Sequence, residues 1–69
     1  MNRVPVSSTS IAVVGYDEDS QTLEIEFRHG GIYQYFDVPA RVHEELMAAP
    51  SMGRYLAEQI KGAYRYARV

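Results

Sequence analysis

The chain has 69 residues and a formal net charge of −2, and its hydrophobic fraction of 46% is typical of a folded domain rather than a disordered one. It contains no cysteine, which excludes disulfides and thiolate metal sites. No apolar run approaches the roughly 20 residues of a membrane-spanning helix, and residues 1–5 lack the apolar core of a signal peptide. We therefore expect a single soluble, cytoplasmic domain over residues 1–69.

The charges are unevenly distributed along the chain. Residues 1–45 carry three arginines against eight acidic residues, whereas residues 46–69 carry four cations against Glu58 alone. An acidic front and a basic tail fit a nucleic-acid-binding face, or two protomers that meet head to tail. They equally fit solvated faces that have neither role.

Strands are predicted in the first half of the chain. Residues 11–16 are mostly β-branched and apolar, which is typical of a well-buried strand. The polar segment 17–21 predicts a turn. In residues 22–28 apolar and charged side chains alternate strictly, so one face of this strand is buried and the other is solvated. The buried face carries Leu23, Ile25 and Phe27.

The next three residues, His-Gly-Gly, predict a hairpin loop into a third strand over residues 32–36. The register of this strand is open. A three-residue loop would pair Phe27 with Tyr33, whereas a two-residue loop would pair Phe27 with Ile32 and turn Gln34 toward the core. We prefer the first register because it keeps Gln34 off the core face.

Two helices are expected to cover the apolar face of this sheet. Pro39 suits the first turn of one helix and Pro50 ends it. Ser51 is a good N-cap for the second helix, and Gly62 a good stop. The apolar stripes are Val42, Leu46, Met47 and Ala49 on the first helix, and Met52, Tyr55, Leu56, Gln59, Ile60 and Ala63 on the second.

The predicted fold class follows from this order of elements. Strands followed by helices indicate an α+β fold in two layers. We expect a three-stranded antiparallel meander followed by two helices packed on one sheet face. Residues 63–69 alternate from side to side and are a candidate for a short C-terminal edge strand.

Little in the sequence points to catalysis. Ser7 and Ser8 belong to a serine-rich segment before the first strand, but no Gly-x-Ser-x-Gly motif surrounds them, so a turn or cap is expected. As a weaker alternative, their hydroxyls beside open backbone are candidates to hold an anion such as phosphate. We expect no enzyme and no cofactor.

Metal binding is not expected either. His29 and His43 are the only histidines, whereas zinc takes three or four protein ligands. Glu24 and Glu26 point to one side of a strand and resemble an acid pair, but nothing indicates burial. We interpret them as a solvated face.

The end of the chain carries the clearest binding pattern. Residues 64–68, Tyr-Arg-Tyr-Ala-Arg, interleave rings with guanidinium groups. Bases stack on such rings, and arginine pairs well with phosphate. The candidate nucleic-acid-binding residues are Arg54, Lys61, Tyr64, Arg65, Tyr66 and Arg68. The alternative is that the tyrosines anchor the tail to the domain while the arginines are solvated.

Segments over residues 6–66 resemble, in order and spacing, the KTSC domain, which is named for a C-terminal extension of some lysyl-tRNA synthetases. The resemblance rests on Val6-Ser7-Ser8, Ser10-Ile11, Val14-Gly15-Tyr16-Asp17, Leu23-Glu24-Ile25-Glu26-Phe27, Gly31-Ile32-Tyr33-Gln34-Tyr35, Val38-Pro39, Ala49, Ser51, Gly53-Arg54-Tyr55, Ile60-Lys61-Gly62 and Tyr64. It implies a small, stand-alone, non-catalytic module. Fusion to a tRNA-charging enzyme suggests contact with RNA, for which tRNA is the natural candidate.

A protein partner is the second hypothesis. Sheet edges of two copies could pair across a two-fold axis, or the basic tail could meet the acidic face of Glu24 and Glu26. We expect no membrane association.

Overall fold

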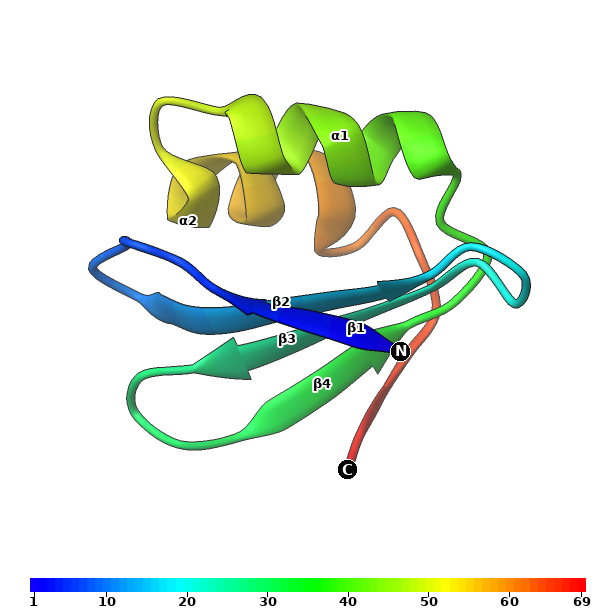
Figure 1. Cartoon of the computed structure of the whole chain (residues 1–69), viewed down its shortest axis with the longest axis horizontal. Coiled ribbons are helices and arrows are strands. Elements are labelled where there is room, and N and C mark those ends of the chain that lie inside the picture. The colour runs from blue at the N-terminus through cyan, green and yellow to red at the C-terminus, as the bar shows by residue number, and fades with distance from the viewer.

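A computed structural model describes all 69 residues, and it places a twisted antiparallel sheet beneath a layer of helices (Figure 1). The five strands lie side by side in chain order, and each is antiparallel to the next. The elements are β1 (Asn2–Pro5), β2 (Ile11–Asp17), β3 (Thr22–Phe27), β4 (Ile32–Tyr35), α1 (Ala40–Ala48), α2 (Met52–Tyr55), the π-helical turn η1 (Leu56–Ile60) and β5 (Tyr66–Arg68).

The α+β class is confirmed, but the sheet has two strands more than the meander of β2, β3 and β4. β5 is the C-terminal edge strand considered above, and it pairs with β4. β1 was not predicted, and it pairs with β2 at the opposite edge, with Val4 opposite Val14. Its four residues are all exposed and end in Pro5, so no alternation marks it. A proline without an N–H is tolerated on such an edge.

The register of β4 differs from both alternatives. Ile25 lies opposite Tyr33, because the Phe27 N–H donates to the Gly31 carbonyl at 3.0 Å and closes the hairpin loop one residue earlier than expected. Gly30 and Gly31 supply the positive φ angles of 104° and 86° that this loop needs. The shift from the preferred register is two residues, which preserves the faces, so Gln34 does point away from the core.

A β-bulge in β2 lets it contribute two core residues three positions apart. The pairing with β3 shifts between Ile11 and Val13, which leaves Ala12 as an extra residue. Ile11 and Val14 both reach the core and are 0% and 1% exposed. Without the extra residue, the period-two alternation of the strand would have turned one of them outward.

The helices end where the sequence predicts. α1 lies between Pro39 and Pro50, and Ser51 caps α2 by accepting a hydrogen bond from the Arg54 N–H at 3.3 Å. After α2 the backbone widens into η1, where the Lys61 N–H donates to the Leu56 carbonyl, five residues back, at 2.8 Å. Gly62, at φ 82°, ends the helix as expected.

The apolar stripe of the second helix is narrower than predicted. Leu56 and Ile60 are buried, but Gln59 and Ala63 are exposed. The wider π turn changes the angular position of Gln59, and Ala63 falls beyond the stop at Gly62.

The core lies between the sheet and the helices. Eleven buried hydrophobic residues form one cluster: Ile11, Val14, Leu23, Ile25, Phe27, Tyr35, Val38, Val42, Leu46, Leu56 and Ile60. These residues come from three strands, from α1 and η1, and from the connection after β4, so the sheet and the helices depend on each other for burial.

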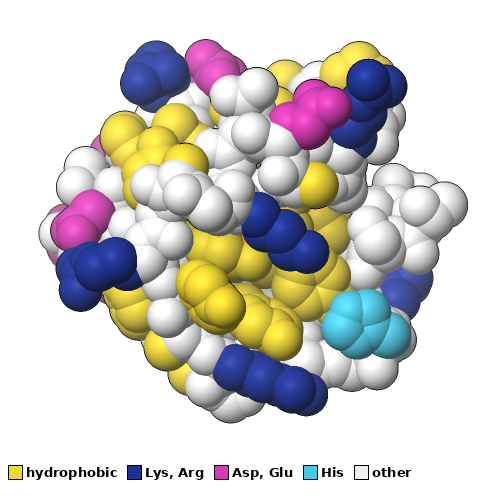
Figure 2. Space-filling view, turned by 180° about the vertical axis from the view of Figure 1, so that it is seen from behind, with side chains coloured by type: hydrophobic (Ala, Val, Ile, Leu, Met, Phe, Trp, Pro, Cys, Tyr) yellow, Lys and Arg dark blue, Asp and Glu magenta, His cyan; other side chains and the backbone are white.

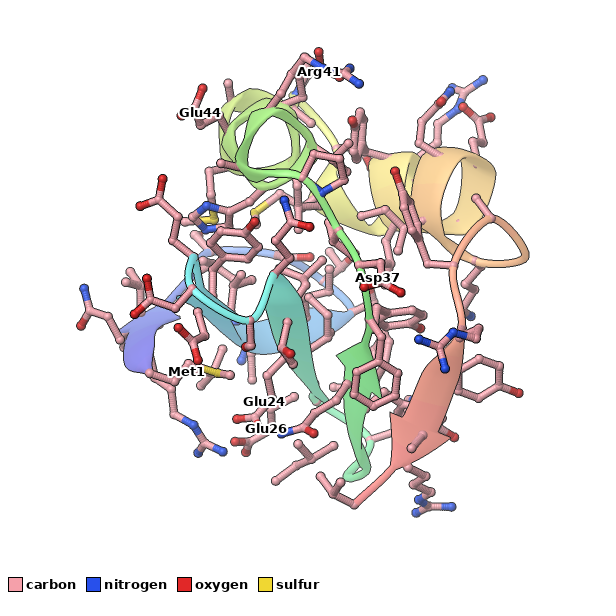
Figure 3. All side chains as sticks on the ribbon, turned by 90° about the vertical axis from the view of Figure 1, so that its right-hand side faces the viewer. Met1, Glu24, Glu26, Asp37, Arg41 and Glu44 are labelled. Atoms are coloured by element: carbon pink, nitrogen blue, oxygen red, sulfur yellow. The ribbon has the colours of Figure 1, made fainter.

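The acid pair Glu24 and Glu26 was predicted to be a solvated face, and the structure corrects this for Glu24. Glu24 and Glu26 lie side by side on the face away from the helices (Figure 3). Glu24 is only 7% exposed, because it forms an ion pair with Arg3 from β1 and accepts a hydrogen bond from Gln34 Nε2 of β4 at 2.9 Å. The solvated-face interpretation of Glu24 was wrong because β1, whose Arg3 side chain reaches Glu24 across β2, was not predicted.

Gly53 marks a close approach between α2 and the turn before β2. A Cβ atom at this position would overlap the Ser10 hydroxyl. We expect Gly53→Ala to lower the free energy of unfolding by about 1 kcal/mol, the low end for overpacking, because the hydroxyl can rotate. Urea unfolding of Gly53→Ala, Ser10→Ala and the double variant measures this. The double variant should recover most of the loss, and equal losses in the single Gly53 variant and the double variant would contradict the clash.

Candidate nucleic-acid interface

A pocket of about 320 Å³ opens between the end of η1 and the β4–β5 edge of the sheet. Its lining residues are Phe27, His29, Tyr33, Tyr35, Lys61 and Tyr66. Figure 2 shows hydrophobic side chains gathered in the middle of one face of the molecule, with Lys or Arg side chains on both sides and a histidine beside them.

Strand pairing builds the aromatic part of this pocket. Tyr66 lies opposite Tyr35 in the β4–β5 ladder, so both rings fall on the same face of the sheet. The Tyr66 ring centroid lies 5.8 Å from that of Tyr35 and 5.9 Å from that of Tyr33. Phe27 continues the row with its ring edge-on to Tyr33 at 5.6 Å. Tyr35 is buried, whereas Tyr66 is 60% exposed and offers an open ring.

Two cations lie over the rings of Phe27 and Tyr33. Lys61 Nζ lies 5.8 Å from the Phe27 ring centroid, and the guanidinium carbon of Arg68 lies 5.8 Å from that of Tyr33. His29 stacks on Phe27 at 5.3 Å. Neither Lys61 nor Arg68 belongs to an ion pair, and no acidic residue lines the pocket. Their charges are therefore available to an anionic ligand.

The phenol at the base of the pocket stays neutral at physiological pH. Burial raises the pKa of Tyr35, and the neighbouring Tyr33 and Tyr66 act in the same direction. The pocket therefore contains cations and neutral rings but no negatively charged group. This combination attracts an anionic ligand.

The structure divides the six candidate residues into three groups: those at the pocket, those in ion pairs, and Tyr64, which packs against the core. Lys61 and Tyr66 line the pocket, and Arg68 lies beside it over the ring of Tyr33. Arg54 pairs instead with Glu58 at 3.1 Å, and Arg65 pairs with Asp37 at 2.9 Å. Arg65 cannot share the pocket because successive side chains of an extended chain point to opposite faces.

Tyr64 follows the alternative interpretation of the tail. It is half-buried and packs against the core cluster, so it anchors the chain between Gly62 and β5. The tail thus uses one tyrosine as an anchor and leaves the other, Tyr66, open to solvent.

Sequence reasoning missed half of the pocket. The sequence predicts Phe27 on the buried face of its strand and His29 in a hairpin loop, and it marks neither of these two nor Tyr33 and Tyr35 as part of a site. Their alternation did place the three rings on one face, but only the pairing of β4 with β5 brings that face to Tyr66 and Arg68. No pattern within one segment carries this information.

The serine-rich segment forms a turn, as expected. Ser8 Oγ accepts hydrogen bonds from the N–H groups of Ser10 at 3.3 Å and Ile11 at 3.2 Å. Ser7 and Ser8 line a second pocket, of about 400 Å³, which Ser51 also borders. No cation lines this pocket, so it offers an anion less charge than the aromatic pocket does.

His43 lies on α1, away from both pockets described above. Its ring is half-buried and stacks on Tyr16 at 4.6 Å, while the Tyr16 hydroxyl donates to the Val38 carbonyl at 2.5 Å. Burial lowers the pKa of His43, and Glu44 opposes this shift. No group of three or more potential metal ligands comes together anywhere in the structure.

The lowered pKa of His43 predicts a pH dependence of stability. The unfolded chain binds this proton more readily, so the contribution is complete above the unfolded value of 6.5 and is lost as pH falls through the lower folded value. Urea unfolding across this window measures it. His43→Phe keeps a ring on Tyr16 and should flatten the profile relative to the natural chain. An unchanged pH profile in His43→Phe would show that another group titrates.

The fold and the pocket define a small α+β domain with one cationic, aromatic surface. The KTSC domain family model matches residues 7–64, and the chain belongs to this family. The crystal structure of a KTSC domain protein from Yersinia pestis superposes with a TM-score of 0.95 at 46% sequence identity, covering 99% of this chain and 96% of that one.

Two relatives show the contexts in which similar sequences occur. An uncharacterized protein of Stutzerimonas stutzeri is 41% identical and matches 100% of this chain and 99% of its own length. A lysine–tRNA ligase of Nostoc is 51% identical over 51 residues, which are 74% of this chain but 9% of that enzyme. The family thus occurs both alone and within a tRNA ligase. None of the helices in the present chain has the length and apolar character to span a membrane.

Proposed function

We propose that this KTSC domain is a non-enzymatic, cytoplasmic module that binds RNA, with tRNA as its natural candidate, through the pocket face. The observation that carries the proposal is the placement of the unpaired cations Lys61 and Arg68 beside the exposed ring of Tyr66. The similarity of 74% of the chain to part of a tRNA ligase supports RNA as the polymer.

The chemistry of these three side chains matches what RNA presents. Phosphates are attracted to Lys61 and Arg68, and a guanidinium can hold phosphate oxygens in a bidentate manner. An exposed tyrosine offers a face on which any base can stack. Because both attractions are independent of base sequence, we expect broad sequence tolerance and strong salt dependence.

Fluorescence anisotropy with total tRNA across a salt series tests this function. We expect affinity to fall with salt by about 0.7–0.9 log units per phosphate contact per log unit of salt. Lys61→Ala with Arg68→Ala should reduce both the affinity and this slope. Arg54→Ala with Arg65→Ala is a matched control, because these two arginines already face Glu58 and Asp37.

The result that would overturn the function is an absence of tRNA binding at low salt. Equal losses in the two double variants would move the interface away from the pocket. Circular dichroism on each variant confirms that the fold is intact.

The open edge of β5 favours a protein partner as the second candidate function. The Arg65 carbonyl accepts from the N–H of Phe36, directly after β4, at 2.9 Å, and the Val69 N–H donates to the Ile32 carbonyl of β4 at 2.8 Å. The backbone groups of Tyr66 and Arg68 therefore face outward. A second copy of the chain could pair there across a two-fold axis. Sedimentation at high protein concentration tests the homodimer, and a monomer would exclude it.

A further inference from the structure

We infer that the aromatic pocket receives a single unpaired nucleotide, with its base against Tyr66 and its phosphates between Lys61 and Arg68. This inference rests on the proposed RNA-binding function and names the part of the RNA that is recognised. It predicts that the domain selects single strands, loops or ends over a duplex.

The different exposure of the pocket's aromatic rings indicates that a base fills the pocket. Phe27 and Tyr35 are 9% and 2% exposed and form its inner wall, whereas Tyr66 is 60% exposed. The exposed face of a tyrosine ring beside a hollow is a surface for a flat ligand. A base within a duplex has both faces covered by its neighbours, so only an unstacked base can lie on this ring.

The charges point to a ligand that is anionic as well as flat. Lys61 lies over Phe27 and Arg68 over Tyr33, and Figure 2 shows basic side chains on both sides of the hydrophobic surface. A nucleotide within a strand has one phosphate on the 5′ side and one on the 3′ side of its ribose. An acidic peptide would satisfy the cations but would leave the aromatic surface uncovered, which makes the nucleotide the better match for both features.

The size of the pocket limits how much of the strand enters. Its volume of about 320 Å³ lies at the low end of the range for small-ligand sites. One nucleotide therefore fills it, and the rest of the strand must run over the surface toward the cations.

The test compares three labelled RNAs by anisotropy at one salt concentration: total tRNA, a short unstructured strand, and the same strand in a blunt duplex. We expect the unstructured strand to bind about tenfold or more tightly than the duplex, and Tyr66→Ala to weaken its binding by about five- to a hundredfold. Tyr66→Phe keeps the ring and should retain most of the affinity. Unlabelled adenosine monophosphate should displace the single strand from the natural chain.

The substituted side chains are exposed, so we expect the variants to fold and any loss of binding to reflect the lost contact. The Tyr66 side chain is largely exposed on an edge strand, and Arg54→Ala serves as a surface control outside the pocket. Binding of tRNA together with equal affinity for strand and duplex, or with no effect of Tyr66→Ala, would overturn the single-nucleotide inference and leave the RNA-binding function standing. An absence of binding to all three RNAs would overturn both.

Discussion

Ile25→Ala is expected to lower the free energy of unfolding by about 2–5 kcal/mol, the cost of a cavity in a closely packed core. Ile25 is 0% exposed, and it lies on the central strand β3 between Val14 of β2 and Tyr33 of β4. A chain of 69 residues has a total stability of only about 3–10 kcal/mol. We therefore expect this single change to leave a substantial fraction of the chain unfolded near 37 °C.

Urea and thermal unfolding followed by circular dichroism measure the effect. Ile32→Ala is the matched control, because it makes the same change on the neighbouring strand at a half-buried position on the other face of the sheet. Ile25→Val should cost about 0.5–1.5 kcal/mol and keeps the measurement informative where the alanine variant fails to fold. Equal effects at positions 25 and 32 would contradict the placement of the core on the helix side.

The layers of this fold could be predicted because each depends on short-range patterns. Strict alternation assigned Leu23, Ile25 and Phe27 to one face, and all three are buried. Pro50 and Gly62 ended their helices because a proline and a positive φ are incompatible with continuing one. These effects act within a few residues and are therefore visible in the sequence.

Pairings between distant segments could not be predicted in the same way. The register of β4 depends on which glycine of the hairpin loop forms the hydrogen bond with Phe27 of β3. β1 can be recognised only from its pairing with β2. The pocket depends on both kinds of information. Alternation places Tyr66 and Arg68 on one side of the tail, but the ladder with β4 decides that this side meets Tyr33.

The residues that were hardest to predict carry both the candidate site and the burial of Glu24. β5 completes the pocket at one edge of the sheet, and β1 at the other edge supplies Arg3, which pairs with Glu24 of the central strand. Both strands are short and exposed, so they contribute little apolar burial of their own. Their backbones are paired with β2 and β4, and the Arg3 side chain adds an ion pair that ties β1 to Glu24 of β3. A substitution at this ion pair is therefore expected to have a large effect.

Arg3→Ala is expected to destabilise the chain by about 1–3 kcal/mol, because it leaves the buried carboxylate of Glu24 with Gln34 as its remaining partner. This loss of stability is smaller than the roughly 3–5 kcal/mol expected when one partner of a fully buried ion pair is removed, because the Arg3 side chain is 49% exposed. Urea unfolding gives the value. Hydrogen exchange of β1 amides should also rise, because Arg3 ties this edge strand to β3.

A second substitution, Glu24→Gln, removes the negative charge of the Arg3–Glu24 ion pair. It separates the effect of the ion pair from the effect of side-chain packing. In Glu24→Gln the amide can still bond to Gln34, and the freed Arg3 turns to solvent, so the loss should stay within about 1 kcal/mol. The double variant should then be more stable than Arg3→Ala alone, because no unpaired charge stays buried. Arg41→Ala is the control, as its pair with Glu45 is exposed on both sides and α1 holds it away from the sheet (Figure 3). A double variant less stable than Arg3→Ala would contradict this account, because it would show that the Glu24 carboxylate stabilises the chain even without Arg3.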